Sequence, residues 1–345
     1  MGRSGITGLP LFIYCNKVSG NGISMHRMRY KILLLLFLIW LPYFVVLFYK
    51  EVMRERIPAA KTAFTESELS PEKDPKNSLY HISMKDSRGS SELGLEEYLI
   101  GILPSTIDMS YEPEVLKAQA ILLRSLFLYE MDEKAVVTLA AENYPYTYIP
   151  ENDWQQIGTD QGDEVCKKAV EAVRQTEGIV MCTDGRIIPG TFCAVSAGGT
   201  RSDASGHHPW LKSVDCQESV EAENYLHVYH FPPDTWKDVK VLETDQRGYA
   251  VTVEADGEKM SGEAFRQQNG LESAWIRIHQ GEDYLVETHG SGHGMGMDQY
   301  YANCLVKEGK KADYREILAY FYKNPTFEKI TMYDCATKSY FPQAS

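Results

Sequence analysis

The chain has 345 residues, of which 43% are hydrophobic and 24% are charged, and its formal net charge at pH 7 is −13. This composition is typical of a globular protein and excludes a fibrous or largely disordered chain. The excess of acidic residues argues against nucleic acid as the main partner, because a phosphate backbone is bound by a basic surface.

An apolar segment near the amino end predicts a single transmembrane helix. Residues 32–49 read ILLLLFLIWLPYFVVLFY, without a charge, between Lys31 and Lys50. At about 1.5 Å per residue this segment just crosses a hydrocarbon core of roughly 30 Å. A cleaved signal peptide is the alternative, but its apolar run is usually only about 7–15 residues long, and no small-residue cleavage site follows here.

The remaining segments are divided around this helix. Basic residues before the span favour a cytoplasmic stub at 1–31, so the residues after 50 are expected on the outer side of the cell membrane. Residues 1–24 have no place in this scheme, which indicates an overlong gene start. Residues 50–78 are rich in charge, Pro, Ser and Thr and predict an extracytoplasmic stalk. A folded domain is expected at 79–335, with a tail at 336–345.

The first part of this domain predicts a strand and two helices. SLYHISMKD alternates like a strand, and SRGSSE after it predicts a turn. Apolar residues spaced by three and four predict a helix over 93–103, and Pro113 is suited to the first turn of a second helix. Arg124 lies beside the apolar stripe of that second helix, either as a substrate contact or as a surface arginine with a buried aliphatic stem.

The second part of the domain is richer in strands. Asp-Gly turns predict two hairpins, over 177–200 and 249–262, and AWIRIHQ and YLVETHG predict further strands. REILAYFYK, at 315–323, predicts a closing helix. Helices that precede a run of antiparallel strands indicate an α+β fold rather than a βαβ alternation.

A glycine-rich loop, THGSGHGMGMDQYYA at 288–302, is the most unusual stretch of the sequence. Its glycines permit positive φ and the close approach of a ligand. The spacing is not GxGxxG, so a dinucleotide site is not indicated. His289 and His293 are four apart, but four glycines at 290–296 argue against the helix that would bring them together as metal ligands.

Four segments in the right order resemble the SpoIID/LytB family: LEEYLIGILPSTIDMSYEPEVLKAQAILLRS at 95–125, IIPGTFCAVSAGGTRSDASG at 187–206, SGEAFRQQNGLESAWIRI at 261–278, and GSGHGMGMDQYYA at 290–302 followed by DYREILAYFYKN. The resemblance implies a cell-wall protein whose partner is the glycan strand of peptidoglycan. Members act as lytic transglycosylases in spore engulfment or as enhancers of amidases. It also implies a cleft that brings Gln299 close to Thr106.

The catalytic acid implied by the resemblance is missing. A lytic transglycosylase needs one carboxyl group that acts first as general acid and then as general base. The family has glutamate in an A-(A/S)-E-M-P stretch, and Thr106 stands at that position here. Asp108 and Glu97 remain as weak candidates, Glu96 being a further carboxyl on the same helix. Transglycosylase chemistry, glycan binding without catalysis, and an enhancer or scaffold role are therefore all open.

The saccharide contacts implied by the resemblance are less affected. A glutamine offers both a donor and an acceptor to sugar hydroxyls, and an aromatic ring stacks on the apolar face of a sugar. His293 has a structural role as its alternative, and the Ser-x-Gly-Gly segment has plain turn chemistry. The candidate substrate-binding residues are His293, Gln299, Tyr300, His289, Ser291, Arg124, Ser196, Gly198, Gly199 and Thr200.

A structural zinc ion is the one cofactor that the resemblance suggests, since some members hold zinc on His and Cys near the segment that corresponds to 187–206. The corresponding residues here are Cys193, His207, His208 and Cys216. Four such groups suit a tetrahedral site, although their spacing matches no short ligand motif. A Cys193–Cys216 disulfide and two free thiols remain the simpler alternatives.

Overall fold

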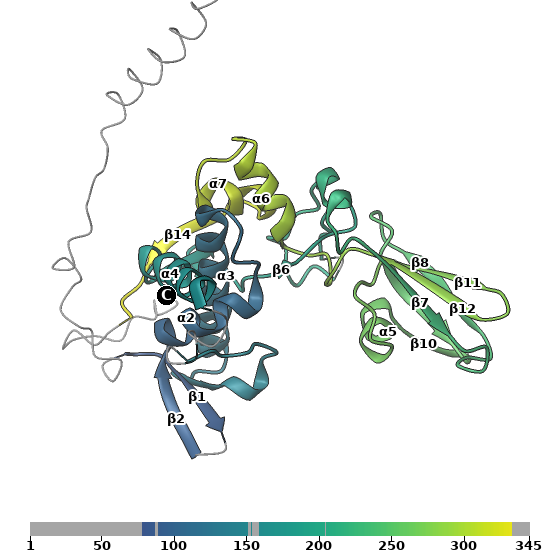
Figure 1. Ribbon diagram of the computed structural model, residues 1–345, viewed down its shortest axis with the longest axis horizontal. Coiled ribbons are helices and arrows are strands. Elements are labelled where there is room, and N and C mark those ends of the chain that lie inside the picture. Colours follow the sequence, from purple (N-terminus) through teal and green to yellow (C-terminus); the bar gives the residue numbers. More distant parts are fainter. Residues whose placement is uncertain (1–77, 87–88, 151–152, 154–158, 204, 333–345) are drawn as a thin grey trace, which may run out of the picture. The chain divides into compact units, whose positions relative to one another are not determined.

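The computed structural model describes residues 78–86, 89–150, 153, 159–203 and 205–332, all within one compact unit, Lys73–Ser345 (Figure 1). The predicted stub, membrane helix, tail and nearly all of the stalk lie outside the described residues. No helix among the described residues is long and apolar enough to span a bilayer. The α+β class is confirmed by the mixture of helices and mainly antiparallel strands.

Five helices contribute buried residues to the first hydrophobic core. They are α2 (Leu95–Thr106), α3 (Pro113–Glu133), α4 (Thr159–Gln175), α6 (Gln299–Lys307) and α7 (Tyr314–Phe321). The two predicted early helices are confirmed. Leu95, Tyr98 and Leu99 of α2 are fully buried, as their spacing predicts. Pro113 occupies the first turn of α3, where its missing N–H costs no hydrogen bond.

Two small sheets accompany these helices. The first has the strand order β2-β1-β3: β1 (His81–Asp86), β2 (Gly89–Gly94) and β3 (Thr138–Ala140), followed by the 3-10 turn η3 (Ala141–Asn143). The second has the order β14-β4-β5: β4 (Ile179–Thr183), β5 (Arg186–Ile187) and β14 (Thr326–Lys329). The predicted turn over 87–92 is wrong in extent, because β2 already begins at Gly89. The predicted closing helix is followed by β14, so a strand comes after it.

A second hydrophobic core lies among six strands and a short helix. One sheet has the order β10-β9-β8: β8 (Val239–Thr244), β9 (Ala250–Ala255) and β10 (Glu258–Ser261). The other has the order β11-β12-β7: β7 (Leu226–Phe231), β11 (Ile276–Gln280) and β12 (Tyr284–His289). Residues of both sheets and of α5 (Gly262–Gln268) share this core. The hairpin predicted at Asp256-Gly257 is confirmed by φ values of 54° and 84°.

The hairpin predicted over 177–200 is confirmed only in the pairing of β4 with β5, and a separate short strand within that range pairs parallel with one inside the glycine-rich loop. β6 (Phe192–Cys193) pairs with β13 (Met297–Asp298), and α6 follows β13 directly. The 3-10 turn η5 (Gln217–Glu221) contacts α6. This arrangement fixes where α6 begins, and the candidate site lies at that helix start.

Candidate functional site

The carboxyl end of α2 and the amino end of α6 meet through one side chain. The Gln299 amide donates from Nε2 to the Thr106 carbonyl oxygen at 2.8 Å and to Gln119 Oε1 at 3.1 Å. The three residues belong to α6, α2 and α3, so this side chain joins three helices. The expected proximity of Gln299 and Thr106, which are 193 residues apart in sequence, is therefore confirmed.

A second amide of α6 holds the other end of the loop between α2 and α3. The Glu112 N–H donates to Asn303 Oδ1 at 2.9 Å. Residues 299 and 303 are one helical turn apart, so both amides lie on one face of α6. Within the loop, the Asp108 carboxylate accepts the Ser110 N–H at 2.8 Å. The loop is thus fixed at both ends and braced by an internal turn.

Two half-buried tyrosines, Tyr111 and Tyr300, flank this junction. Burial raises the pKa of Tyr111, and the nearby carboxylates of Asp108 and Asp298 raise it further. Burial also raises the pKa of Tyr300. Both phenols are therefore neutral at physiological pH and keep a hydroxyl donor together with a ring that can stack on a sugar.

Thr106 supplies no acid to this junction. Its hydroxyl donates to the Leu103 carbonyl at 2.8 Å, inside the last turn of α2. Asp108 is exposed to solvent, whereas a catalytic carboxyl of this kind is expected in dry surroundings. Glu97 lies nine positions before Thr106 in α2, about 14 Å away along the helix axis. Neither carboxyl stands at the position of the glutamate that the resemblance implies, and a catalytic role of either one stays a prediction.

The buried carboxylate of Asp298 fixes the start of α6. Its Oδ1 accepts the Tyr301 N–H at 3.0 Å, and its Oδ2 accepts the Ser196 N–H at 2.9 Å and the Ser219 hydroxyl at 2.6 Å. Burial raises the pKa of Asp298, and these hydrogen bonds oppose that effect. Because the side chain is fully buried and used by the fold, it positions Gln299 and does not meet a ligand.

The glycines before α6 allow two chain segments to touch. All four have positive φ: Gly290, Gly292, Gly294 and Gly296. A Cβ at Gly296 would lie 1.9 Å from the Thr191 carbonyl oxygen, and one at Gly294 would lie 2.3 Å from the Tyr249 hydroxyl. The expectation that these glycines admit a ligand is corrected, since the chain's own backbone and Tyr249 make the close approach.

His293 lies between two of these glycines and contacts the backbone. Its Nδ1 accepts the Met295 N–H at 3.1 Å, which places the proton of the neutral ring on Nε2. The pKa of His293 is lowered to about 4, mainly by burial; Glu263 opposes this shift, and Arg266 and Arg201 add to it. This backbone bond supports the structural alternative, and a saccharide contact from Nε2 stays a prediction.

The low pKa of His293 predicts a loss of stability in mild acid. The unfolded side chain binds a proton below about pH 6.5, whereas the folded one does so only near pH 4. The free energy of unfolding is therefore fully retained above pH 6.5, and on the order of 3 kcal/mol is lost as the pH falls to 4. Urea unfolding of the wild type and of His293→Gln measures this slope. Equal slopes in the two proteins would contradict the assignment.

His289 and Ser291 contact residues of β12 and of the segment that leads into β11. The His289 ring stacks on Trp275 with a centroid distance of 3.8 Å, and its Nε2 lies 2.7 Å from Glu287 Oε1. The Ser291 hydroxyl donates to Glu272 Oε2 at 2.8 Å. Both side chains are half-buried, and their predicted role in saccharide binding stays a prediction.

Comparison with known proteins bears on the same segments. Residues 84–182 match the model of the SpoIID family, described as "Stage II sporulation protein". The chain is similar to stage II sporulation protein D of Bacillus subtilis, 29% identical over 253 residues that cover 66% of this chain and 73% of the relative. The same protein of Bacillus amyloliquefaciens is 27% identical over 258 residues, which cover 66% of this chain and 72% of the relative.

The chain carries a domain of the SpoIID family. An uncharacterized protein of Brachyspira hyodysenteriae is also similar, 25% identical over 253 residues that cover 67% of this chain and 66% of the relative. The family match contains Thr106 and Gln119, whereas Gln299 and Asn303 lie beyond it. The described fold joins the matched segment to these two later residues.

The Ser-x-Gly-Gly segment, at 196–199, is structural. Ser196 and Thr200 have no exposed surface. The Thr200 hydroxyl donates to the Lys212 carbonyl at 3.0 Å and accepts the Val214 N–H at 3.1 Å. Gly199 is also buried and Gly198 has a φ of 81°. The predicted saccharide contacts of Ser196 and Thr200 are therefore wrong in this structure, and turn chemistry accounts for the segment.

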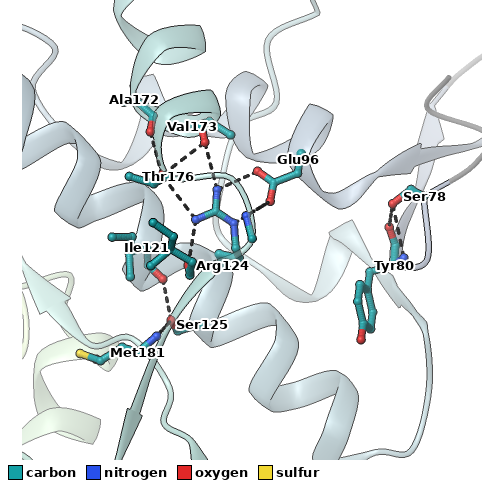
Figure 2. A network of polar contacts seen from close by, with 12 residues as sticks. Ser78, Tyr80, Glu96, Ile121, Arg124, Ser125, Ala172, Val173, Thr176 and Met181 are labelled. Atoms are coloured by element: carbon teal, nitrogen blue, oxygen red, sulfur yellow. Dashed lines mark hydrogen bonds and ion pairs between the residues drawn. The ribbon is translucent and has the colours of Figure 1, made fainter. Parts of the chain in front are cut away.

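Arg124 is an internal residue of the SpoIID domain. Figure 2 shows its guanidinium among Glu96, Val173 and Thr176, with bonds of 2.6 and 2.7 Å to the two oxygens of Glu96. The side chain is fully buried, so the predicted substrate contact and the predicted surface arginine are both wrong. Glu96 is likewise no candidate acid, because the bidentate ion pair occupies its carboxylate.

The predicted zinc ligands are not brought together. Among the described residues no three His, Cys, Asp or Glu side chains are arranged to hold a metal ion. Cys193 and Cys216 are buried free thiols whose pKa burial raises, so neither has thiolate character. His208 is engaged by Asp203 at 3.0 Å, and His207 is exposed. The zinc prediction and the alternative of a Cys193–Cys216 disulfide are both contradicted.

Sequence reasoning missed four residues of the site: Tyr111, Gln119, Asp298 and Asn303. Asp298 directly precedes Gln299, and a polar residue before a helix is a recognisable N-cap signal. Asn303 follows Gln299 by one turn, which signals a shared face.

A hollow of about 440 Å³ is lined by Lys212, Val214, Lys311, Glu316, Ala319 and Tyr320. None of the predicted saccharide contacts lines that hollow.

Proposed function

We propose that this SpoIID-family protein binds peptidoglycan glycan strands at the junction of α2, α3 and α6 and has no transglycosylase activity of its own. The observation that carries the proposal is the hydrogen bond from Gln299 to the Thr106 carbonyl. It brings the family's late signature motif to the position of the missing acid. This contact supports a glycan-binding site that lacks the catalytic carboxyl.

The groups around this junction suit a neutral sugar. Gln299 Oε1 has no hydrogen-bond partner among the described residues and can accept a sugar hydroxyl or an acetamido N–H. The exposed Asp108 carboxylate is a further acceptor. The rings of Tyr111 and Tyr300 offer apolar faces, and their neutral hydroxyls offer donors. Hydrogen-bond donors, hydrogen-bond acceptors and aromatic rings are the groups that bind the hydroxyls and the apolar ring faces of a glycan strand.

The same geometry supports the absence of catalysis. The reaction needs one group that protonates the glycosidic oxygen and then removes the proton of the sugar's C6 hydroxyl, which closes an anhydro ring. A threonine hydroxyl is too weak an acid for the first step at neutral pH. Moreover, the hydroxyl of Thr106 already donates to Leu103. Catalysis through Asp108 is the second candidate function, favoured only by the proximity of that carboxylate to Tyr111.

A glycan pull-down with matched tyrosine variants tests the proposal. The full-length protein in detergent is mixed with insoluble glycan strands from which the stem peptides have been removed. Tyr300→Ala is expected to weaken binding about tenfold or more, because stacking contributes about 0.5–1.5 kcal/mol beyond the buried area of the ring. Tyr129→Ala is the control, since Tyr129 lies about 24 Å along α3 from its start.

The outcomes separate the two functions. Binding without released sugars, and weaker binding by Tyr300→Ala than by the control, supports the glycan-binding module. Anhydro-ended products that are lost in Asp108→Ala would establish the enzyme instead. Equal binding by both tyrosine variants would contradict this site.

The location and the wider role also belong to this proposal. Residues 32–49 would anchor the protein in the cell membrane with the SpoIID domain outside, where it meets the wall. The relatives named stage II sporulation protein D support a role in sporulation. Without catalysis, the protein would hold glycan for other wall-remodelling proteins such as an amidase. Retention in the membrane fraction after an alkaline wash would support the anchor.

A further inference from the structure

The two sheets around the second core have four edge strands, and three of them are protected by charge. Natural proteins place charged side chains on edge strands because an uncharged edge pairs with other chains. β10 carries Glu258 and Lys259, β8 carries Lys240 and Glu243, and β11 carries Arg277. β7 reads LHVYHF and has no Lys, Arg, Asp, Glu or Pro. It is the unprotected edge of these two sheets.

The geometry of β7 also suits strand addition. β8 has register irregularities that distort an edge, whereas β7 pairs with β12 in an unbroken antiparallel register from Leu226 to Phe231. Among the described residues no strand pairs with the outer side of β7. Every second N–H and C=O of this edge therefore points away from its sheet.

The side chains of β7 divide between the core and solvent. Tyr229 and Phe231 pack against the second core. Leu226 and Val228, on the opposite face, are 55% and 48% exposed. Two large aliphatic side chains on an unprotected edge are unusual on the surface of a protein that remains a monomer.

We infer that β7 pairs antiparallel with β7 of a second copy of this chain, with Val228 opposite Val228. In this register exposed residues meet exposed residues, because directly opposite side chains lie on one face of a sheet. Leu226 then faces His230 of the second copy. The two three-stranded sheets become one continuous sheet of six strands across a two-fold axis.

Charge favours a second copy at this edge. Two chains of net charge −13 repel each other over most of their surfaces, so they associate best where acidic residues are absent. The nearest acid on the exposed face is Glu287, which lies beside Val228 on β12. In the pair, the two Glu287 residues are three strand spacings apart, about 14 Å, beyond the screening length of about 8 Å at physiological salt. The Glu287 carboxylate is also engaged by His289 at 2.7 Å.

Sedimentation equilibrium of the full-length protein in density-matched detergent tests the inference. The wild type is expected to show a concentration-dependent dimer. Val228→Lys should raise the dimer dissociation constant at least tenfold, because two lysines would face each other at the axis. His279→Lys is the control, since His279 is exposed on β11, which already carries Arg277. A monomeric wild type, or equal shifts in the two variants, would overturn the inference.

A second experiment does not depend on the lysine variant folding. Cα atoms of directly opposite antiparallel residues lie about 4.5–5.5 Å apart, within the range that a disulfide spans. Val228→Cys is therefore expected to give a covalent dimer on mild oxidation, beyond any formed by the wild type. His279→Cys should not. Covalent dimers in equal yield from both variants would contradict the proposed register. Glycan binding is measured separately, so failure of either proposal leaves the other testable.

Discussion

Thr106→Glu is expected to release anhydro-ended sugars from glycan strands that the wild-type protein leaves intact. The new carboxyl would stand at the end of α2, on the residue whose backbone carbonyl accepts from the Gln299 amide and whose position matches the family's acid by the sequence resemblance. General acid and base catalysis by one positioned group typically contributes about 10²–10⁴-fold. We therefore expect product formation at least about 100-fold above the wild-type background, measured by mass spectrometry of the soluble products.

The matched control for this gain is Thr106→Gln, which has nearly the shape of glutamate but no proton to give. If both variants released the same amount of product, the acid would not be what the site lacks. If neither released any while both still bound glycan, the remaining parts of the catalytic arrangement would also be missing. Either result would contradict the view that a single substitution separates this site from an active one.

Arg124→Met is expected to lower the free energy of unfolding by about 3–5 kcal/mol, because it leaves the Glu96 carboxylate buried without its partner. It would also remove donors from the Ile179 and Val173 carbonyls. Urea unfolding of the full-length protein measures the loss. Because stability depends on pairing rather than on charge alone, the double variant Glu96→Gln, Arg124→Met should lose less than the sum of the single variants.

Lys134→Met is the control for this loss. Lys134 caps the carboxyl end of α3 and bonds to Glu130 at 2.6 Å, but its side chain is 51% exposed. An exposed pair of this kind contributes only about 0.3–0.5 kcal/mol. Losses of the same size in Arg124→Met and Lys134→Met would show that the Glu96 pair is not the internal brace that its burial indicates.

Local patterns predicted much of the fold, and their failures have physical reasons. The large apolar residues of α2 and α3 and the Asp-Gly turns of the hairpins are strong signals. α4 was missed because its buried stripe is built of small residues, Ala169, Ala172 and Val173. β7 and β8 were missed although both alternate, since their outward residues include Leu226, Val228 and Leu242 and blur the polar side of the pattern.

The site was predictable only where a motif was matched as a whole. Gln299 and Thr106 were expected to be close because both belong to segments of one family, and no local pattern connects residues so far apart. Burial decided the other cases. Arg124, Ser196 and Thr200 are polar residues in matched segments, yet each is consumed by hydrogen bonds inside the fold. Sequence alone does not separate a polar residue that binds a ligand from one that holds the backbone.

The tether of the loop between α2 and α3 has a consequence for the order of biosynthesis. Glu112 and Asn303 are 191 residues apart in the sequence, and Thr106 and Gln299 are 193 residues apart. A chain that folds as it is synthesised can form α2 and α3 early, but the loop between them stays unclamped until α6 has been made. The nascent protein would thus complete the junction of α2, α3 and α6 only near the end of synthesis, so an unfinished chain lacks the assembled site.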